Sequence, residues 1–524
     1  MRSIRVPLIG VAVAVATASG SALALPLPLS ASAVAAPAAG DAPDPGSTRS
    51  LPLVPLPDGE RSAAPGTPAA QGLPRRDVEP FSLVGVVWEE PDTELHGTVQ
   101  VRTRSTATGA WSAWQDLETH QGDHAADPGT AEARSGAVRG GTAPLWVGDS
   151  DGVEVRVRPE APDERGAAAP ALPRGLRVEL VHPGGGPADG ARPPQDLRDA
   201  PHDDAPHDDA PQADPDPDAD EPADEDTGTT DPGGEEDGTA DPADEETGAD
   251  EDTGEGTGTT DPVDEGPANP TNAGQGAVLL SPEESAASAV NADLVALGAV
   301  EIPELSKTET EEDLPNTTAA KPYIGPRPRI VTRKGWGADE KLREANFLYS
   351  KSVQAAFVHH SATGNNYTCA QAPSVLRGIY RYHVQSMGWR DLGYNFAVDK
   401  CGTIYEGRAG GVAKPVQGAH TLGFNNNTTG IAVLGSFSSA TPPAKAVTAV
   451  SKLTAWKLGL YGKNPLGKST LTSGGGNLYK KGTKVQLNTI SGHRDGYSTA
   501  CPGAKLYGKL GTIRSTAAGY QGRP

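Results

Sequence analysis

The sequence is poor in aromatic residues and has no long apolar run after its N-terminus. Phe, Trp and Tyr account for 5% of its 524 residues, so nothing indicates the stacked aromatic platforms that bind nucleic-acid bases. No segment beyond the N-terminus is long and apolar enough to span a bilayer. A His-Glu-x-x-His signature is also missing, so no dedicated glutamate base is evident. We therefore expect a soluble protein with no nucleic-acid partner and no membrane span.

Cysteine is equally scarce, and its three occurrences all fall in the last third of the chain, at Cys369, Cys401 and Cys501. An odd number of cysteines requires an explanation for the one without a partner. The simplest is a disulfide between Cys369 and Cys401, which leaves Cys501 as a metal thiolate. The rival is a disulfide that uses Cys501 and removes that ligand.

The N-terminus has the features of an export signal. Arg2 and Arg5 precede a mostly apolar stretch, and small residues follow. We predict a signal peptide over residues 1–35 and a secreted, monomeric protein that is extracellular or in the cell wall. A membrane anchor is the alternative, although Pro7 and Gly10 interrupt the short apolar run.

The net charge of −23 is unevenly distributed along the chain. Pro201–Glu265 holds 27 acidic residues and no Lys or Arg, whereas residues 325–524 hold 26 Lys and Arg against 7 Asp and Glu. A basic exported domain suits an anionic cell wall and its polymers better than nucleic acid. The acidic stretch has too little hydrophobicity to fold, so we predict a long disordered linker.

Composition divides the rest into several regions, because a chain of this length exceeds one compact core. Alternating apolar and polar residues between Phe81 and Val181 predict an all-β, sandwich-like domain. Trp111, Trp114 and Trp146 are either a sugar-binding platform or part of its core. The predicted boundaries are a Pro/Ala-rich tether at 36–79, a β-rich domain at 80–184, the disordered linker at 185–276, a connecting segment at 277–325 and a C-terminal domain at 326–524.

The C-terminal region mixes helical and strand patterns. Apolar residues at helical spacing predict a helix over Ala370–Met387, and Thr441-Pro442-Pro443 starts a second one over Ala444–Leu460. Short strands are predicted at Tyr394–Val398, Thr403–Glu406 and Gly430–Leu434. This pattern is typical of an α/β domain with a central mixed sheet and helices packed on it.

Metal-binding residue types lie at the ends of ordered segments in this domain. His359 ends the apolar run Ala355–Val358, and His360 should face the other side of the sheet, so only one of the two is expected to be a ligand. His493 and Cys501 lie in one loop. Two imidazoles and a thiolate with no evident fourth protein ligand are typical of a catalytic zinc site, which ionises water near neutral pH. A Cys-His peptidase that uses Cys501 and His493 is a competing interpretation.

Five motifs in order resemble one known family. They are His-His-Ser-Ala at 359–362, Gly-Trp-Arg-Asp-Leu-Gly-Tyr-Asn-Phe at 388–396, Tyr-Glu-Gly-Arg at 405–408, Gly-Ala-His-Thr at 418–421, and Gly-His-Arg-Asp at 492–495 with Cys-Pro-Gly at 501–503. Residues 329–510 thus resemble the peptidoglycan recognition proteins and type 2 zinc-dependent N-acetylmuramoyl-L-alanine amidases. The resemblance implies Zn²⁺ ligands at His359, His493 and Cys501, a catalytic role for Tyr394 and a contribution from Thr499.

The resemblance also implies a groove for peptidoglycan or a muropeptide. It places His383, His420 and Asn425 at the border of this groove, although packing or loop hydrogen bonding would also explain both histidines. Arg408 would grip a peptide carboxylate with two hydrogen bonds, or be a surface charge. The implied function is a secreted zinc amidase that cleaves the bond between the muramic acid lactyl group and L-Ala. A recognition module that binds peptidoglycan without cutting it is the alternative.

Overall fold

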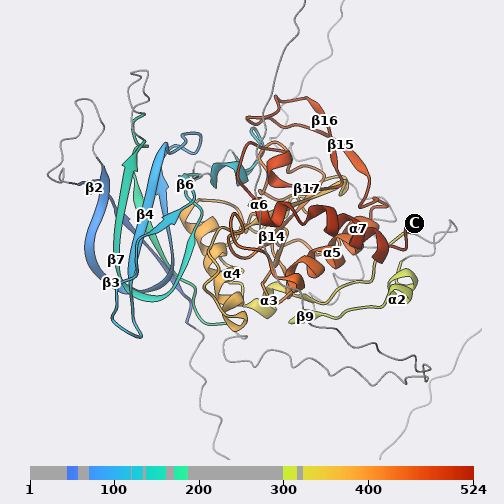
Figure 1. The fold of residues 1–524 in the computed structure, drawn as a ribbon, viewed down its shortest axis with the longest axis horizontal. Coiled ribbons are helices and arrows are strands. Elements are labelled where there is room, and N and C mark those ends of the chain that lie inside the picture. Colours follow the sequence, from blue (N-terminus) through green and yellow to red (C-terminus); the bar gives the residue numbers. More distant parts are fainter. Residues whose placement is uncertain are drawn as a thin grey trace, which may run out of the picture.

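The computed structural model describes residues 44–56, 70–119, 121–133, 137–160, 170–186, 299–314 and 323–524. They form an all-β domain, at the left of Figure 1, which lies against a larger α/β domain. The predicted signal peptide, the acidic linker beyond residue 186 and most of the connecting segment lie outside the described residues.

The N-terminal domain is built on one antiparallel sheet, which confirms its predicted all-β character. The strands run in the order β1-β8-β3-β7-β4-β5, and β2 and β6 pair with β3. Irregular pairing between the long strands β3 and β7 breaks the ladder, and such bulges bend a sheet. The elements are β1 (Ser47–Pro52), β2 (Val54–Pro55), β3 (Gln71–Trp88), β4 (Gly97–Ser105), β5 (Gln115–Leu117), η1 (Gln121–His124), β6 (Gly140–Gly141), β7 (Leu145–Pro159) and β8 (Arg177–His182).

The prediction of a flexible tether over residues 36–79 is wrong for its described parts. Strand β1 pairs with β8 along its whole length, and the first half of β3 pairs with β7. These strand segments are largely exposed, with only Gly72 and Leu73 buried between Gln71 and Pro80. An exposed strand needs no apolar alternation, so the sequence carried no periodic signal for it.

The C-terminal domain contains a seven-stranded mixed sheet in the order β17-β11-β14-β12-β13-β10-β9. The neighbours β17, β11, β14 and β12 are parallel, whereas β13 is antiparallel to β12 and β9 is antiparallel to β10. Its strands are β9 (Glu301–Ile302), β10 (Ile330–Val331), β11 (Ala355–His360), β12 (Phe396–Val398), β13 (Ile404–Glu406), β14 (Thr428–Val433) and β17 (Ile490–Gly492), and a separate hairpin consists of β15 (Lys468–Thr472) and β16 (Lys484–Asn488). Because β9 joins this sheet, the domain begins earlier than the predicted boundary at residue 326.

Helices cover both faces of this sheet (Figure 1). The two long predicted helices and the three predicted strands are confirmed within a few residues of their expected ends. The first helix continues from a 3-10 turn through an α-helix into one π-helical turn. The helical elements are α2 (Lys307–Glu312), α3 (Arg333–Trp336), η2 (Cys369–Gln371), α4 (Ala372–Arg381), η3 (Tyr382–Ser386), α5 (Ala444–Gly459), η4 (His493–Asp495), α6 (Ala504–Tyr507) and α7 (Leu510–Tyr520).

Strand β11 lies in the middle of the core and is buried on both faces. Ala356 and Val358 pack into the main core against α5 and α7, while Ala355 and Phe357 belong to a separate cluster with Phe424. This division follows the period of two along a strand. His359 therefore lies on the same face of the sheet as Phe357, and His360 lies on the same face as Val358.

The two domains share an apolar interface. Leu83 and Val87 of β3 pack with Leu376 and Ile379 of α4, while the alternate residues of β3 pack into the core of the β domain. Gly85 lies between Leu83 and Val87, and a Cβ atom there would approach the Tyr382 ring to 2.5 Å. The absence of a side chain at this position therefore allows close contact between sheet and helix.

Only one of the three tryptophans belongs to this interface. Trp146 is buried there, 5% exposed. Trp111 and Trp114 are half-buried, and guanidinium groups of Arg75 and Arg156 lie 5.0 and 4.0 Å from their respective ring centroids. The core interpretation is thus confirmed for Trp146 alone among the three.

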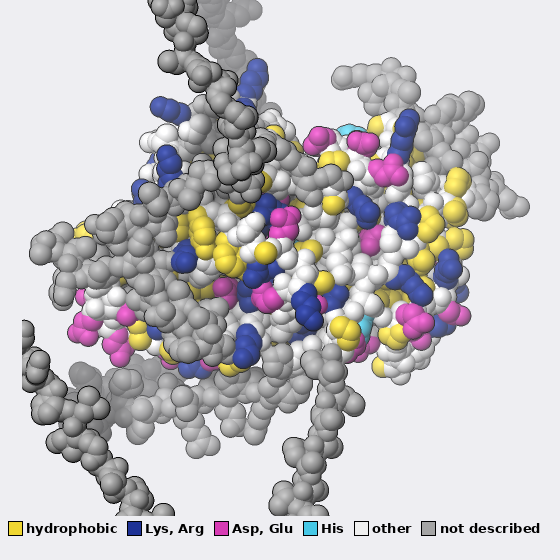
Figure 2. Space-filling view, turned by 180° about the vertical axis from the view of Figure 1, so that it is seen from behind, with side chains coloured by type: hydrophobic (Ala, Val, Ile, Leu, Met, Phe, Trp, Pro, Cys, Tyr) yellow, Lys and Arg dark blue, Asp and Glu magenta, His cyan; other side chains and the backbone are white. Residues whose placement is uncertain are grey.

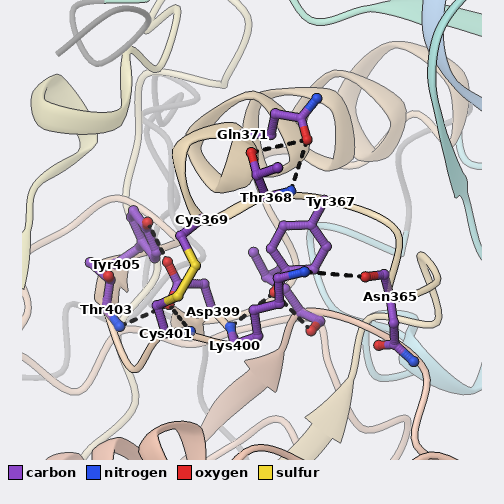
Figure 3. Close-up of a disulfide and its surroundings, with 11 residues drawn as sticks. Asn365, Tyr367, Thr368, Cys369, Gln371, Asp399, Lys400, Cys401, Thr403 and Tyr405 are labelled. Atoms are coloured by element: carbon purple, nitrogen blue, oxygen red, sulfur yellow. Dashed lines mark hydrogen bonds between the residues drawn. A yellow bond between two sulfur atoms is a disulfide. The ribbon is translucent and has the colours of Figure 1, made fainter. Parts of the chain in front are cut away.

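A disulfide joins Cys369 at the start of η2 to Cys401 in the turn between β12 and β13, as the cysteine count predicts (Figure 3). Asp399 shapes that turn, because its carboxylate accepts hydrogen bonds from the backbone of Cys401 and Thr403 and from the Tyr405 hydroxyl, each at 2.9 Å. The bridge fixes the start of the long helix to the sheet and leaves Cys501 as a free, buried thiol.

On the face seen in Figure 2, Lys and Arg side chains are interspersed with Asp and Glu side chains, so charge of neither sign predominates there. Among the described residues, no helix has the length and apolar character needed to cross a membrane.

Glu406 gives the folded C-terminal domain a characteristic pH dependence. Burial raises the pKa of this carboxyl to about 7, although nearby Arg333 lowers it. In the unfolded chain its pKa is near the ordinary 4.5. The stability that the protonated group contributes is therefore fully present below pH 4.5 and is lost as the pH rises to about 7.

We predict that Glu406→Gln removes this pH dependence. Relative to wild type, the variant should gain up to about 3 kcal/mol of unfolding free energy between pH 5 and pH 8, since each pKa unit corresponds to about 1.4 kcal/mol. Urea denaturation at both pH values measures the difference, with the exposed Glu304→Gln as control. Parallel profiles for wild type and Glu406→Gln would contradict the assignment.

Candidate metal centre

Two neighbouring parallel strands place the first two metal-binding side chains. In the ladder between β11 and β17, Phe357 is opposite Ser491 and Val358 is opposite Gly492. His359 and His493 are the next residues on each strand, so both lie at the same carboxyl edge of the sheet. Their ring centroids are 4.6 Å apart, and both side chains are fully buried. This edge is where α/β sheets commonly bind ligands.

The loop that follows η4 brings Cys501 to the same edge of the sheet as His359 and His493. The Arg494 amide donates to the Cys501 carbonyl at 3.1 Å, and the Cys501 amide donates to Thr499 Oγ1 at 3.2 Å. The Cys501 Sγ lies 3.8 Å from His359 Nδ1. His360 lies on the other side of the strand, where its Nδ1 accepts from the Phe437 amide. The structure thus brings together the three side chains predicted as ligands and leaves His360 out.

A fourth potential ligand comes from the β domain. His124 Nε2 lies 3.8 Å from Cys501 Sγ, and potential ligand atoms of His124, His359, His493 and Cys501 all lie within 4.8 Å of one another. The structure therefore places a fourth potential ligand beside the three that the sequence predicts. No pattern around His124 indicated the contact, since it depends on the packing of two domains.

The donor set and its spacing fit a zinc ion. Zinc–nitrogen and zinc–sulfur bonds of about 2.1 and 2.3 Å in a tetrahedron place the ligand atoms about 3.5 Å apart. The two sulfur–nitrogen distances of 3.8 Å are close to this value. His493 Nδ1 is buried and has no hydrogen-bond partner among the described residues, as expected of an atom that binds a metal.

The outer atoms of the histidines are held by further contacts. His359 Nε2 lies 3.4 Å from Thr421 Oγ1, and His493 Nε2 lies 3.1 Å from the Asp123 carbonyl oxygen. His124 Nδ1 lies 2.7 Å from Asp123 Oδ1. Such contacts orient metal-binding imidazoles and fix which nitrogen faces the ion.

The buried environment of the cluster favours the uncharged forms of His359 and His493 and the binding of a cation. Burial, followed by the nearby histidines, holds the pKa of His359 well below its usual value. Burial lowers the pKa of His493 to about 3, although Asp123 opposes this shift. Neutral imidazole is the form that binds metals. Burial also raises the pKa of the Cys501 thiol, so a thiolate there needs a positive partner such as a metal.

Tyr394 and Thr499 both adjoin the cluster. The Tyr394 ring centroid lies 5.5 Å from that of His359 and 5.7 Å from that of His124. Thr499 Oγ1 accepts from the Cys501 amide, and Thr499 lines one pocket with Asp123, His124 and Cys501. Both residues therefore lie beside the cluster.

Arg408 is not the surface charge that one interpretation expected, since its side chain is 5% exposed. Its guanidinium grips a carboxylate with two hydrogen bonds of 2.7 Å, and that carboxylate belongs to Glu132 of the β domain. Nε of Arg408 donates to the Leu392 carbonyl at 2.7 Å. The bidentate geometry expected for a peptide carboxylate is thus present, with an internal partner.

The remaining groove candidates are buried as well. Asn425 accepts from the amides of His420 and Thr421, and its Nδ2 donates to the Ala125 carbonyl and to Asp127 Oδ1. His420 lies 5.3 Å from His359, ring to ring.

His383 Nδ1 accepts from the Gly393 amide, next to Tyr394 in the chain. His420 Nδ1 lies 3.0 Å from Thr421 Oγ1, so the alternative of loop hydrogen bonding is present for both histidines.

A pocket of about 310 Å³ reaches the cluster and is lined by residues from both domains, among them Glu118, His124, His360, Thr499 and Cys501. A larger pocket of about 1040 Å³ is lined by Arg333, Arg377 and Tyr380 and contains none of the four cluster residues. Because the smaller pocket is lined by His124 and Cys501 of the cluster, we place the functional site there.

Comparisons with known proteins match each domain separately. The family described as N-acetylmuramoyl-L-alanine amidase matches residues 349–504. The family described as Rv3811 N-terminal galactose-binding domain-like matches residues 35–174. The first match contains His359, His493 and Cys501, and the second contains His124.

Individual relatives match the C-terminal domain. Peptidoglycan-recognition protein SC2 of Drosophila melanogaster is 30% identical over 186 residues, which cover 35% of this chain and 85% of the relative. Peptidoglycan-recognition protein 1 of Holotrichia diomphalia is 27% identical over 183 residues, covering 35% and 79%. A crystal structure of peptidoglycan recognition protein-LE in complex with tracheal cytotoxin is 28% identical, covers 35% of this chain and 92% of its own, and has a TM-score of 0.28.

We predict that the cluster binds one zinc ion per chain and that Cys501→Ala weakens this binding more than tenfold, because loss of an outer contact alone costs about 10–100-fold. Elemental analysis after dialysis and competition with a chromogenic chelator measure stoichiometry and affinity. His360→Asn is the matched control, since His360 lines the same pocket but is not among the four clustered ligands. Equal zinc affinity in wild type and Cys501→Ala would contradict the assignment.

Proposed function

Since this chain belongs, through its C-terminal domain, to the family of peptidoglycan recognition proteins and type 2 amidases, we propose that it is a secreted zinc-dependent N-acetylmuramoyl-L-alanine amidase. Its substrate is the amide between the lactyl group of muramic acid and L-Ala in peptidoglycan. The convergence of His359, His493 and Cys501 beside Tyr394 carries this proposal. These three donors leave one tetrahedral position for water or substrate when no other ligand takes it.

The reaction adds water to the lactyl carbonyl carbon and breaks its bond to the L-Ala nitrogen. When bound by His359, His493 and Cys501, zinc supplies a Lewis acid that acidifies water and polarises a carbonyl. The Tyr394 hydroxyl is the nearby donor for the negative charge that develops on the carbonyl oxygen. The departing amine takes up a proton, for which Tyr394 or water held near Thr499 is the source.

Substrate binding is assigned to the groove residues. The rigid fork of Arg408 matches a carboxylate of the stem peptide, as its geometry toward Glu132 illustrates. Asn425 offers an amide group whose Nδ2 donates to Ala125 and Asp127 in this structure.

The proposal that the protein is exported rests on the N-terminal sequence and on the cysteines. The Cys369–Cys401 disulfide suits an oxidising compartment outside the cytoplasm. A cell-wall substrate requires the same location.

A non-hydrolytic recognition module is the second candidate, because the family name of the relatives refers to recognition. Purified peptidoglycan distinguishes the two. The amidase releases new free amino groups of L-Ala in the presence of zinc, and this release stops after chelation and in Cys501→Ala. Binding to peptidoglycan without any release of amino groups would favour the recognition module.

We predict that Tyr394→Phe lowers kcat about 10²–10³-fold, the typical cost of losing one donor to a developing oxyanion. Zinc content should stay at the wild-type value, because the phenol is not among the four clustered ligands. Steady-state kinetics on a soluble muropeptide, together with elemental analysis, separates these effects. An unchanged kcat would exclude the assigned role of Tyr394.

A further inference from the structure

One segment of the β domain, Asp123–Glu132, lies over the metal cluster and the residues next to it. We call it the covering segment; it begins in η1 and precedes β6. It contacts the C-terminal domain at the metal cluster, at Asn425 and at Arg408. These are the positions at which the proposed amidase binds its metal and its substrate.

The first contact places an imidazole among the metal donors. His124 is buried, its ring centroid is 4.5 Å from that of His493, and its Nε2 is 3.8 Å from Cys501 Sγ. The carbonyl oxygen of Asp123 holds the segment in place, because it accepts from the Leu422 amide at 2.9 Å and lies 3.1 Å from His493 Nε2. Within the segment, the Asp123 carboxylate adjoins His124 Nδ1. A carboxylate behind an imidazole is the arrangement that supports a histidine bound to zinc.

The second contact covers Asn425. Asp127 Oδ1 accepts hydrogen bonds of 2.8 Å from the Gly423 amide and from Asn425 Nδ2. Ala125 adds its carbonyl oxygen, which accepts from the same Nδ2 at 2.9 Å. Both donor directions of this amide group are thus satisfied by the covering segment.

The third contact neutralises Arg408. Glu132 and Arg408 are 4% and 5% exposed and form a bidentate pair. A stem-peptide carboxylate that needs this guanidinium therefore competes directly with Glu132.

We propose that His124 is a fourth protein ligand of the metal and that the covering segment holds the chain in a closed, latent form. This inference rests on the proposed function, since latency has meaning only for a site that acts on substrate. Four protein ligands are characteristic of closed zinc sites, whereas catalytic sites keep one position for water or substrate. Opening requires the covering segment to leave the cluster, which also frees Asn425 and Arg408.

The character of the contacts supports separate movement of the segment. Outside the covering segment, the domains are held together by apolar packing of β3 on α4 and by hydrogen bonds such as those from Ser386 to Glu179 and from Tyr382 to the Thr142 carbonyl. The covering segment is attached mainly through carboxylates and carbonyl oxygens, whose partners are satisfied equally by water or by a polar substrate. Buried ion pairs such as Glu132–Arg408 add little net stability but are strict about geometry.

The decisive experiment probes the metal in the full chain loaded with Co²⁺, whose visible spectrum reports ligand exchange. Azide is the probe, because it binds only where a coordination position is open. We expect little spectral change in wild type and azide binding about tenfold or more tighter in His124→Ala, because affinity scales with the fraction of open protein. His96→Ala, an exposed histidine of the same domain, is the matched control.

A second variant keeps the test valid if His124→Ala folds poorly. Glu132→Gln leaves every cluster ligand in place but weakens the hold on Arg408, so it should also increase azide binding. Equal azide binding in wild type, His124→Ala and Glu132→Gln would overturn the proposal. So would a Co²⁺ spectrum that does not change when His124 is removed.

Peptidoglycan hydrolysis separates this inference from the proposed function. If both hold, His124→Ala releases L-Ala amino groups about tenfold or more faster than wild type. If the variant opens the metal position but neither protein hydrolyses peptidoglycan, closure by His124 stands and the amidase proposal fails. If wild type hydrolyses as fast as the variant, the amidase proposal stands and latency fails.

Discussion

The parallel pairing of β11 with β17 is the constraint on which the site depends. Both strands end at the same edge of the sheet, and the residue after the last paired position is a histidine on each. Backbone hydrogen bonds therefore fix two imidazoles side by side before any metal is present. Cys501 then needs only a short loop from η4 to reach them. A metal centre built this way is rigid, because each ligand is anchored by core packing or loop hydrogen bonds.

The second domain is joined to this frame at two places. Apolar residues of β3 lie against α4, and their burial drives association without directional requirements. The covering segment instead uses paired charges and hydrogen bonds, which are specific in geometry and give modest net stability. This division allows the domains to stay together while the contacts at the metal change.

Much of the C-terminal fold could be predicted because its signals are local. The helix over 370–387 carries an apolar stripe, and the β14 strand is a short apolar run between polar loops. His359 and His360 were separated correctly by strand alternation alone. The cysteine count also predicted the Cys369–Cys401 bridge. The polar half of β3 was missed because an exposed strand paired through its backbone leaves no hydrophobic pattern.

The sequence by itself determined which reactive groups are available: two histidines and a lone cysteine in a family-like order, a cysteine count most simply explained by one disulfide, and an arginine able to hold a carboxylate. Only the tertiary structure decided which residues those groups contact. His124 and Glu132 are 235 and 276 residues before His359 and Arg408, so no spacing rule connects them. Contacts over such separations arise from the docking of two folded surfaces, whose relative placement is encoded by shape and packing rather than by local pattern.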